Sequence, residues 1–299
     1  MADPSSVFSC PQCAAQVCLP PGRISDSCSF CEAPLVAADR VAVEPVDRVA
    51  PFVLDNIQAA GRLRTHLAGS WLAPETVRTS ATPEALEAVL VPFWVYQATA
   101  RSRWTARIGI WWYRTETYTV VVDGKTQTRT RQVKETEWFP TGGTHVATYV
   151  DHLVSGSRGL PEHEANALEP FDLGKSRSYS PAMLAGLIAE QPSVDHQQAR
   201  RTASEELTAL EHRAIRSFLP GDEYAGLENQ TQTELSDVEL VLLPVWIATF
   251  RHREEVWRLL VNGQTGEVVG QAPRDPKKIA GLVLLALAAL AALVWMVSS

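Results

Sequence analysis

The residues of this chain best suited to chemistry are five cysteines, all within its first 31 residues. Four of them form two Cys-x-x-Cys pairs, Cys10 with Cys13 and Cys28 with Cys31. Each pair can hold two thiolates about 2.3 Å from one zinc ion, and two pairs complete a tetrahedron. Four thiolates leave no open position for water or substrate, so the spacing predicts a structural Zn²⁺ site rather than a catalytic or redox one.

The predicted zinc ribbon occupies residues 6–36. A segment this short cannot bury a sufficient core, so we expect the metal to supply its folding free energy. The fifth thiol, Cys18, is interpreted as a small packed residue of a hairpin; a regulatory thiol or alternative ligand is the less favoured reading. Arg23 is the ribbon's only cation in the sequence, which argues against nucleic-acid binding through this element.

The other end of the chain carries nineteen uncharged, mainly apolar residues, 279–297. As a helix this segment is nearly 30 Å long, about the hydrocarbon thickness of a bilayer. Arg274, Lys277 and Lys278 precede it, and the positive-inside rule then places the N-terminal body in the cytoplasm. We expect no secretory signal peptide, and therefore a tail-anchored, single-pass protein of the cell membrane.

Between ribbon and tail, residues 37–51 are expected to be a linker and residues 52–273 a cytoplasmic body. The body opens with an amphipathic pattern that predicts a helix from an N-cap at Asp55 to near Pro74. An apolar run at 89–96 predicts a buried strand. Two Thr-, Tyr- and Trp-rich arms, 107–122 and 125–138, flank Asp123-Gly124, a hairpin signal.

Two segments of the body resemble each other: LVPFWVY at 90–96 and LLPVWIA at 242–248. They predict two related β units, about 87–140 and 237–272, separated by a helical insertion at about 181–219. The second unit turns at NGQTG, 262–266, which leads to another strand and is therefore read as a hairpin rather than a phosphate cradle. The expected fold class is α+β: an N-terminal zinc ribbon, an antiparallel-sheet body and one C-terminal transmembrane helix. Whether the two units share one sheet is left open.

Within the insertion we expect a short helix at 181–190 and a long one at 195–219. Apolar residues at helical spacing mark the buried face of the long helix: Ala199, Ala203, Leu207, Leu210, Ala214 and Phe218. Charged residues mark a face expected to be solvated: Arg200, Arg201, Glu205, Glu206, Glu211 and Arg213.

No catalytic constellation emerges from the sequence. The seven histidines are scattered and are expected on the surface, and GxSxG, P-loop and GxGxxG motifs do not occur. The net charge of −7 argues against nucleic acid as the chain's main partner. Arginines and aromatic residues between 111 and 131 suit single-stranded nucleic acid or anionic headgroups, but an ordinary two-faced sheet is the favoured interpretation.

The order of these segments resembles bacterial membrane-anchored zinc-ribbon proteins (YdjG-like) of envelope-stress operons, which also encode a phage shock protein A homologue and an SPFH-domain protein. The resemblance runs from Cys10 to the tail and is most specific in PFD…YSPAMLAG, 170–186, and LVNGQTGEVVG, 260–270. Ala14 and Glu32 depart from the pattern, because ribbons commonly carry glycine there.

The resemblance implies a non-enzymatic role, in which partner proteins are held at the membrane during envelope stress. We therefore expect an adaptor whose partners are the lipid bilayer, the SPFH-domain protein and the phage shock protein A homologue. The alternative is a nucleic-acid-binding zinc-ribbon protein displayed at the membrane. A third hypothesis, an enzyme whose site is assembled from distant residues, would require a pocket on which several His and Glu side chains converge.

Overall fold

The protein is described from a computed structural model, which covers residues 7–19, 22–37, 45–70, 72–74, 77, 86–122, 125–184, 186–252, 255–273 and 275–298. In this part of the chain the fold is sheet-rich α+β, with a two-stranded sheet, a ten-stranded sheet and one apolar C-terminal helix. The predicted fold class is confirmed at this level. The chain forms two compact units, the first from 1–95, 153–199 and 239–299, the second from 96–152 and 200–238.

The N-terminal segment forms two small hairpins. The strands β1 (Val7–Ser9) and β2 (Gln16–Cys18) pair with each other, and β3 (Arg23–Ser27) pairs with β4 (Pro34–Val36), both antiparallel. The second hairpin continues into the large sheet, because β3 also pairs with β9 (Ile188–Glu190). The buried Ser25 hydroxyl donates to the Leu187 carbonyl at 2.7 Å. The ribbon is thus joined to the sheet of the first unit by backbone pairing.

The segment predicted as a linker, 37–51, contains a strand instead. Residues 38–44 lie outside the described part, but β5 (Arg48–Val49) pairs in parallel with β10 (Glu223–His252) and antiparallel with β8 (Arg177–Ser178). Val49 and Ala50 are buried against the core. The linker prediction is wrong here, because pairing across almost two hundred residues leaves no local pattern in so short a strand.

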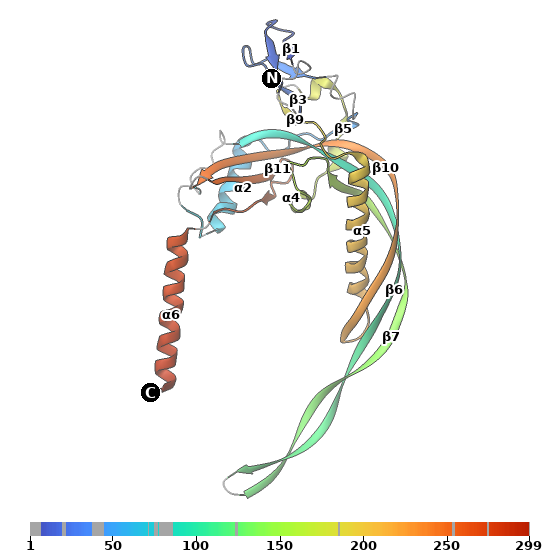
Figure 1. The fold of residues 1–299 in the computed structure, drawn as a ribbon, viewed down its shortest axis with the longest axis vertical. Helices are drawn as coiled ribbons and strands as arrows, with labels where there is room; N and C mark the ends of the chain where they lie inside the picture. Colours follow the sequence, from blue (N-terminus) through green and yellow to red (C-terminus); the bar gives the residue numbers. More distant parts are fainter. Residues whose placement is uncertain are drawn as a thin grey trace. The chain divides into compact units, whose positions relative to one another are not determined.

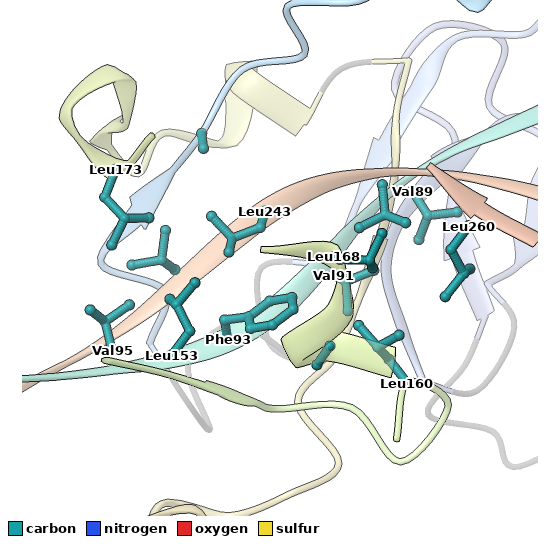
Figure 2. Close-up of a cluster of buried hydrophobic side chains, with 14 residues drawn as sticks. Val89, Val91, Phe93, Val95, Leu153, Leu160, Leu168, Leu173, Leu243 and Leu260 are labelled. Atoms are coloured by element: carbon teal, nitrogen blue, oxygen red, sulfur yellow. The ribbon is translucent and has the colours of Figure 1, made fainter. Parts of the chain in front are cut away.

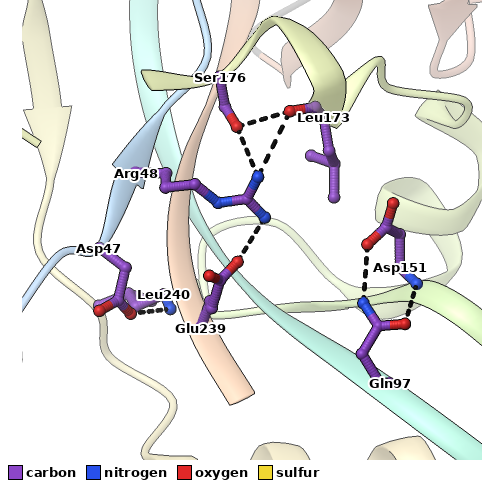
Figure 3. Close-up of polar contacts among 8 residues, drawn as sticks. All are labelled: Asp47, Arg48, Gln97, Asp151, Leu173, Ser176, Glu239 and Leu240. Atoms are coloured by element: carbon purple, nitrogen blue, oxygen red, sulfur yellow. Dashed lines mark hydrogen bonds and ion pairs between the residues drawn. The ribbon is translucent and has the colours of Figure 1, made fainter. Parts of the chain in front are cut away.

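A polar contact fixes β5 in place (Figure 3). The Arg48 guanidinium donates to the Ser176 hydroxyl at 2.9 Å and also forms an ion pair with Glu239. The Asp47 carboxylate accepts from the Leu240 backbone N–H at 2.7 Å. These contacts join β5, the loop before β8 and the start of the apolar run in β10.

The first long helix, α2 (Asn56–Gly69), confirms its predicted start. Asp55 caps it through a capping box, accepting from the Gln58 backbone N–H at 2.8 Å while the Gln58 side chain accepts from Asp55 at 3.1 Å. Leu63 and Leu67 are buried as expected, whereas Ile57 is 64% exposed. The helix ends before Pro74, and Trp71 lies outside the described residues.

The core of the first unit lies on one face of the sheet, where alternate apolar side chains of two neighbouring long strands, β6 (Leu86–Val122) and β10, gather (Figure 2). The similar segments 90–96 and 242–248 therefore lie in adjacent strands of one sheet. Further strands complete this part: β11 (Glu255–Asn262) pairs antiparallel with β10, and β12 (Val268–Val269) pairs antiparallel with β11. Short helical turns cover the core: α4 (Glu162–Leu168) and the 3₁₀ turn η3 (Leu173–Lys175).

The pairings of β5 with β10 and of β6 with β9 are parallel, so the sheet is mixed rather than purely antiparallel. The helix predicted at 181–190 is also wrong. Residues Pro181–Leu184 form a 3₁₀ turn, η4, and Ile188–Glu190 form β9. The apolar residues whose spacing resembles that of a helix belong partly to the turn η4 and partly to the strand β9, which pairs with a strand on each side.

The second unit contains the outer parts of β6 and β10, most of β7 (Lys125–Ser155) and most of α5 (His196–Phe218). In Figure 1, α5 lies along one face of these strands. The first half of its predicted buried stripe is confirmed, because Ala199, Ala203 and Leu207 are fully buried. In the second half the buried positions are Glu211 and Ile215 instead of Leu210, Ala214 and Phe218. Glu211, expected on the solvated face, is 0% exposed, while Phe218 is 46% exposed.

The paired arms of β6 and β7 extend beyond the end of α5 (Figure 1). Cross-strand ion pairs join Arg114 to Glu135 at 2.8 Å and Glu116 to Arg131 at 2.7 Å. Later residues of β6 face earlier residues of β7, which is the antiparallel order that a hairpin requires. The predicted turn, Asp123-Gly124, lies outside the described residues.

Candidate metal centre and other candidate sites

The first cysteine pair forms a compact turn. The Cys10 backbone N–H donates to the Ala15 carbonyl at 2.8 Å, and the Ala14 N–H donates back to the Cys10 carbonyl at 2.9 Å. This closed loop places the side chains of Cys10 and Cys13 on the same side of the turn.

The second pair repeats this geometry. The Cys28 N–H donates to the Ala33 carbonyl at 2.8 Å, and the Glu32 N–H donates to the Cys28 carbonyl at 2.9 Å. In addition, the Phe30 N–H donates to the Cys28 sulfur at 3.5 Å. Two turns with matching bonds therefore face each other, each contributing two sulfurs.

Both turns hold a non-glycine residue in the left-handed region, with φ of 58° at Ala14 and 58° at Glu32. A side chain there costs about 1 kcal/mol relative to glycine. The two positions at which the sequence departs from the common ribbon pattern are thus the two at which glycine would be favoured. The backbone bonds of each turn retain this conformation.

The four sulfurs lie together, within 4.8 Å of one another: Cys10, Cys13, Cys28 and Cys31. The Cys10 and Cys31 sulfurs are 3.6 Å apart, and those of Cys13 and Cys28 are 3.8 Å apart. A tetrahedron with metal–sulfur distances of about 2.3 Å has edges of about 3.8 Å, so the cluster fits a tetrahedral metal ion such as zinc. All four cysteines are free of disulfides.

The proton affinities of the cluster differ between its members. The backbone N–H of Cys13 is the main cause that lowers the pKa of Cys10 to about 6. For Cys31 the Ala33 backbone N–H lowers the pKa, but the Cys13 thiol, burial and the other thiols raise it to about 12. Thiols this close cannot all ionise together unless a cation neutralises them, which is the role of a bound metal.

The cluster lies beside a very small apolar core, formed by Val17, Leu19, Ala33, Leu35 and Ala37. Cys10 and Cys28 are buried, whereas Cys13 is exposed. The side chain of Cys18 lies outside the described residues, so its interpretation stays a prediction. Arg23 forms ion pairs with Asp26 and Glu87, at 2.8 and 3.6 Å, and so adds little positive charge to the ribbon.

The C-terminal helix α6 (Pro276–Ser298) is long and apolar enough to cross a membrane. The most apolar 18-residue stretch within residues 276–296 has a mean hydropathy of 2.6, and none of that stretch is buried in the protein. Asp275 begins the helix, accepting from the Lys277 backbone N–H at 3.0 Å. Of the predicted basic flank, Lys277 is exposed, Lys278 donates to the Ala73 carbonyl at 2.8 Å, and Arg274 lies outside the described residues.

On the β6–β7 arms, where a basic and aromatic surface is the less favoured interpretation of the sequence, two of the arginines are neutralised. Arg114 and Arg131 are paired with glutamates across the strands, and the pKa of Glu116 is lowered, first by its hydrogen bond from Arg131. The Lys134 ammonium lies 3.1 Å from the centre of the Trp111 ring. The charges of Arg114 and Arg131 are thus balanced by acidic side chains of the neighbouring strand.

The structure also gathers a polar cluster that sequence reasoning missed. The buried Glu211 carboxylate accepts from the Ser102 hydroxyl at 2.6 Å, from His145 Nδ1 at 2.8 Å and from the Tyr149 hydroxyl at 2.7 Å. Burial raises the pKa of Glu211, but these three hydrogen bonds outweigh it and the net pKa is lowered. His152 Nε2 lies 3.1 Å from Glu206. The side chains of His145 and His152 are 25% and 13% exposed, so both are partly buried and not the exposed surface residues that the sequence predicts.

This cluster satisfies a buried charge and does not resemble a nucleophile activated by a base. The Ser102 hydroxyl points at a carboxylate of lowered pKa, which is a poor proton acceptor, and the His145 ring bonds the same oxygen rather than the serine. No sequence motif could reveal it, because its members come from three separated segments.

The NGQTG turn has a structural role that its sequence alone did not indicate. The fully buried Asn262 side chain donates to the Leu168 and Pro170 carbonyls, at 2.8 and 3.0 Å, and accepts from the backbone N–H groups of Gln264 and Thr265. The turn thus ties the end of β11 to the loop after α4. Leading from one strand to another, it agrees with the predicted hairpin.

Comparison with known proteins gives one similarity over most of the chain. The uncharacterized protein YdjG of Bacillus subtilis (strain 168) is 23% identical over 255 residues, which are 82% of this chain and 69% of that protein. No protein-family model matches the chain. No solved structure matches it either.

Proposed function

We propose that this protein is a non-enzymatic, tail-anchored adaptor that holds partner proteins at the cytoplasmic face of the cell membrane. The observation that carries this proposal is the presence of two features at opposite ends of one chain. Near the N-terminus lies a closed four-sulfur cluster, and near the C-terminus an unburied apolar helix. The first stabilises a recognition element and the second provides a membrane anchor.

The sulfur cluster holds a structural Zn²⁺ through Cys10, Cys13, Cys28 and Cys31. Four thiolates saturate a tetrahedral ion, so it stabilises the fold without binding substrate. The small core beside the cluster supports this role, because so few apolar side chains cannot hold two hairpins by themselves.

The helix α6 spans the bilayer, and the basic residues before it, Arg274, Lys277 and Lys278, remain on the cytoplasmic side. The reduced cytosol keeps the four thiols available for zinc.

Partner proteins dock on the ribbon or on the β body. The outer arm of β6 supports this, because it exposes large apolar side chains: Trp111, Trp112, Tyr113, Tyr118 and Val121. The resemblance to YdjG-like proteins makes an SPFH-domain protein and a phage shock protein A homologue the proposed partners, and envelope stress the proposed setting. The neutralised arginines of the arms weigh against the alternative, a nucleic-acid-binding protein.

Membrane fractionation tests the proposal. A chain ending at Pro273 should move to the soluble fraction together with its partner, detected by cross-linking before lysis. A chain in which residues 279–297 are replaced by an unrelated apolar helix of equal length should return both to the membrane. A partner that stays at the membrane without the anchor would refute the adaptor role.

A second comparison assigns the docking element. The Cys10→Ser/Cys13→Ser variant should lose its zinc, measured by atomic emission, and lose the partner as well if the ribbon carries the contact. Retention of the partner would assign docking to the β body. Zinc retained by the double variant would refute the proposed ligand set.

A further inference from the structure

The second unit contains a cavity of about 520 Å³ that no predicted function uses. Three adjacent strands line it with three consecutive residues each: Arg101, Ser102 and Arg103 of β6, Thr144, His145 and Val146 of β7, and Gln230, Thr231 and Gln232 of β10. The strand β6 lies between the other two, so its residues are at the centre of the cavity.

Alternation along the strands shows which face the cavity occupies. Ser102 and His145 bond Glu211 of α5, and Thr231 lies 2.9 Å from the Ser102 hydroxyl, so these three side chains point toward the helix. Their neighbours on each strand must point to the opposite face. No described residue of α5 lines the cavity, which therefore opens on the face turned away from the helix.

Six side chains form its walls: Arg101, Arg103, Thr144, Val146, Gln230 and Gln232. The two arginines are two positions apart on one strand, which places their backbone origins about 7 Å apart on the same face. The two glutamine amides flank them on one side and the Thr144 hydroxyl on the other. Within the described chain, no acidic side chain lines the cavity.

The two arginines lack the partners that other arginines of this protein have. Arg114 and Arg131 each have a glutamate across the strands, and Arg258 is paired with Glu164. Within the described residues, neither Arg101 nor Arg103 forms an ion pair, although the chain as a whole carries a net charge of −7. The cavity is thus a site of concentrated positive charge with neutral hydrogen-bonding groups around it.

We propose that this cavity binds a phosphomonoester group. A planar guanidinium presents paired N–H donors that match phosphate oxygens, and two of them balance a dianion, whereas a carboxylate needs only one. The amides and hydroxyl bind the remaining oxygens or the polar part of the ligand. A volume of 520 Å³ is in the range of sites for small ligands. The group comes from either a soluble phosphate ester or the headgroup of phosphatidic acid.

The test uses the full-length protein in phosphatidylcholine nanodiscs and follows amide hydrogen exchange of residues 99–105 and 228–234. One arm adds glycerol 3-phosphate to the solution, and the other replaces part of the lipid by phosphatidic acid. Protection in the first arm identifies a soluble phosphate ester, and protection only in the second identifies a lipid headgroup. Protection in neither arm overturns the proposal.

Matched variants separate the site from general electrostatics. Arg101→Gln with Arg103→Gln should weaken binding by roughly a hundredfold, about tenfold for each guanidinium. The corresponding lysine variants should be intermediate, since charge remains but the paired donors are lost. Arg129→Gln removes one exposed cation of β7 outside the cavity and should leave the affinity unchanged.

The result that refutes specific binding is an equal loss in the Arg129→Gln variant and the single Arg101→Gln variant. Both cavity arginines are exposed, so their replacement should not disturb folding. Unchanged exchange of the α5 amides in every variant checks this directly. The cavity is distinct from the sulfur cluster and from α6. A negative result for phosphate binding would therefore not affect the adaptor proposal.

Discussion

Replacing Glu211 with glutamine keeps the shape of a buried side chain and removes its charge. The wild-type carboxylate accepts three hydrogen bonds at 0% exposure, from Ser102, His145 and Tyr149. Its pKa is lowered despite burial, so the ionised form is favoured by the folded protein over the neutral one. Glutamine resembles the neutral form, and the substitution should therefore be destabilising.

The magnitude follows from the three bonds. A hydrogen bond to a charged acceptor contributes about 1.5–3 kcal/mol, against about 0.5–1.5 kcal/mol for a neutral one. The glutamine amide oxygen can accept hydrogen bonds from two of the three donors. The third donor faces the amide NH₂ group, which cannot accept. Part of this loss is offset because a neutral amide costs less to bury. The substitution should therefore lower the free energy of opening of α5 by about 2 kcal/mol. Amide hydrogens that exchange through this opening should then exchange roughly thirtyfold faster.

Hydrogen exchange of the full-length protein in detergent measures this directly at the amides of residues 207–218. The matched control is Glu205→Gln, on the exposed face of the same helix, which should change exchange little. Equal α5 protection in the wild type and Glu211→Gln would refute the reasoning.

The pH dependence provides a second check. A carboxyl group whose pKa is lowered by folding contributes stability above its unfolded pKa, about 4.3, and this stability is lost as the pH falls through the lower folded value. The difference between the wild type and Glu211→Gln should therefore be constant between about pH 6 and 8 and shrink below about pH 4.3. A difference that grows on acidification would contradict this assignment.

Four further substitutions test other parts of the structure. Ala14→Gly and Glu32→Gly should each stabilise the ribbon by about 1 kcal/mol, because both residues have a φ of 58°. Competition with a chelator should then show about fivefold tighter zinc binding for each variant. Unchanged zinc binding would contradict the proposed backbone strain. Asn262→Ala should cost about 2–4 kcal/mol, since two carbonyls and two N–H groups lose a buried partner; a thermal midpoint equal to the wild type would disprove this role. Gly270→Ala should also destabilise the protein, by at least about 1–2 kcal/mol, because φ is +121° and the added Cβ would lie 2.7 Å from the Arg258 carbonyl oxygen. The same thermal midpoint measures this loss. An unchanged midpoint would show that the end of the strand can shift to accommodate the Cβ.

The sequence by itself determined the features that local patterns encode. Two Cys-x-x-Cys turns place sulfurs together because the geometry of each turn is set within six residues, and the structure brings the four sulfurs within 4.8 Å. The apolar helix at the C-terminus and the capped start of α2 are equally local, since hydrophobicity and capping depend on neighbouring residues.

Only the tertiary structure decided how distant segments pair. The strands β5 and β9 are two and three residues long, and long-range partners define them, so their sequences read as a linker and as a helix. The charged pattern of the long helix predicts that Glu211 faces solvent, yet donors from β6 and β7, many residues away in sequence, make its burial favourable. A pattern within one element reveals its periodicity, but which of its faces is buried depends on the groups that the rest of the chain brings to it.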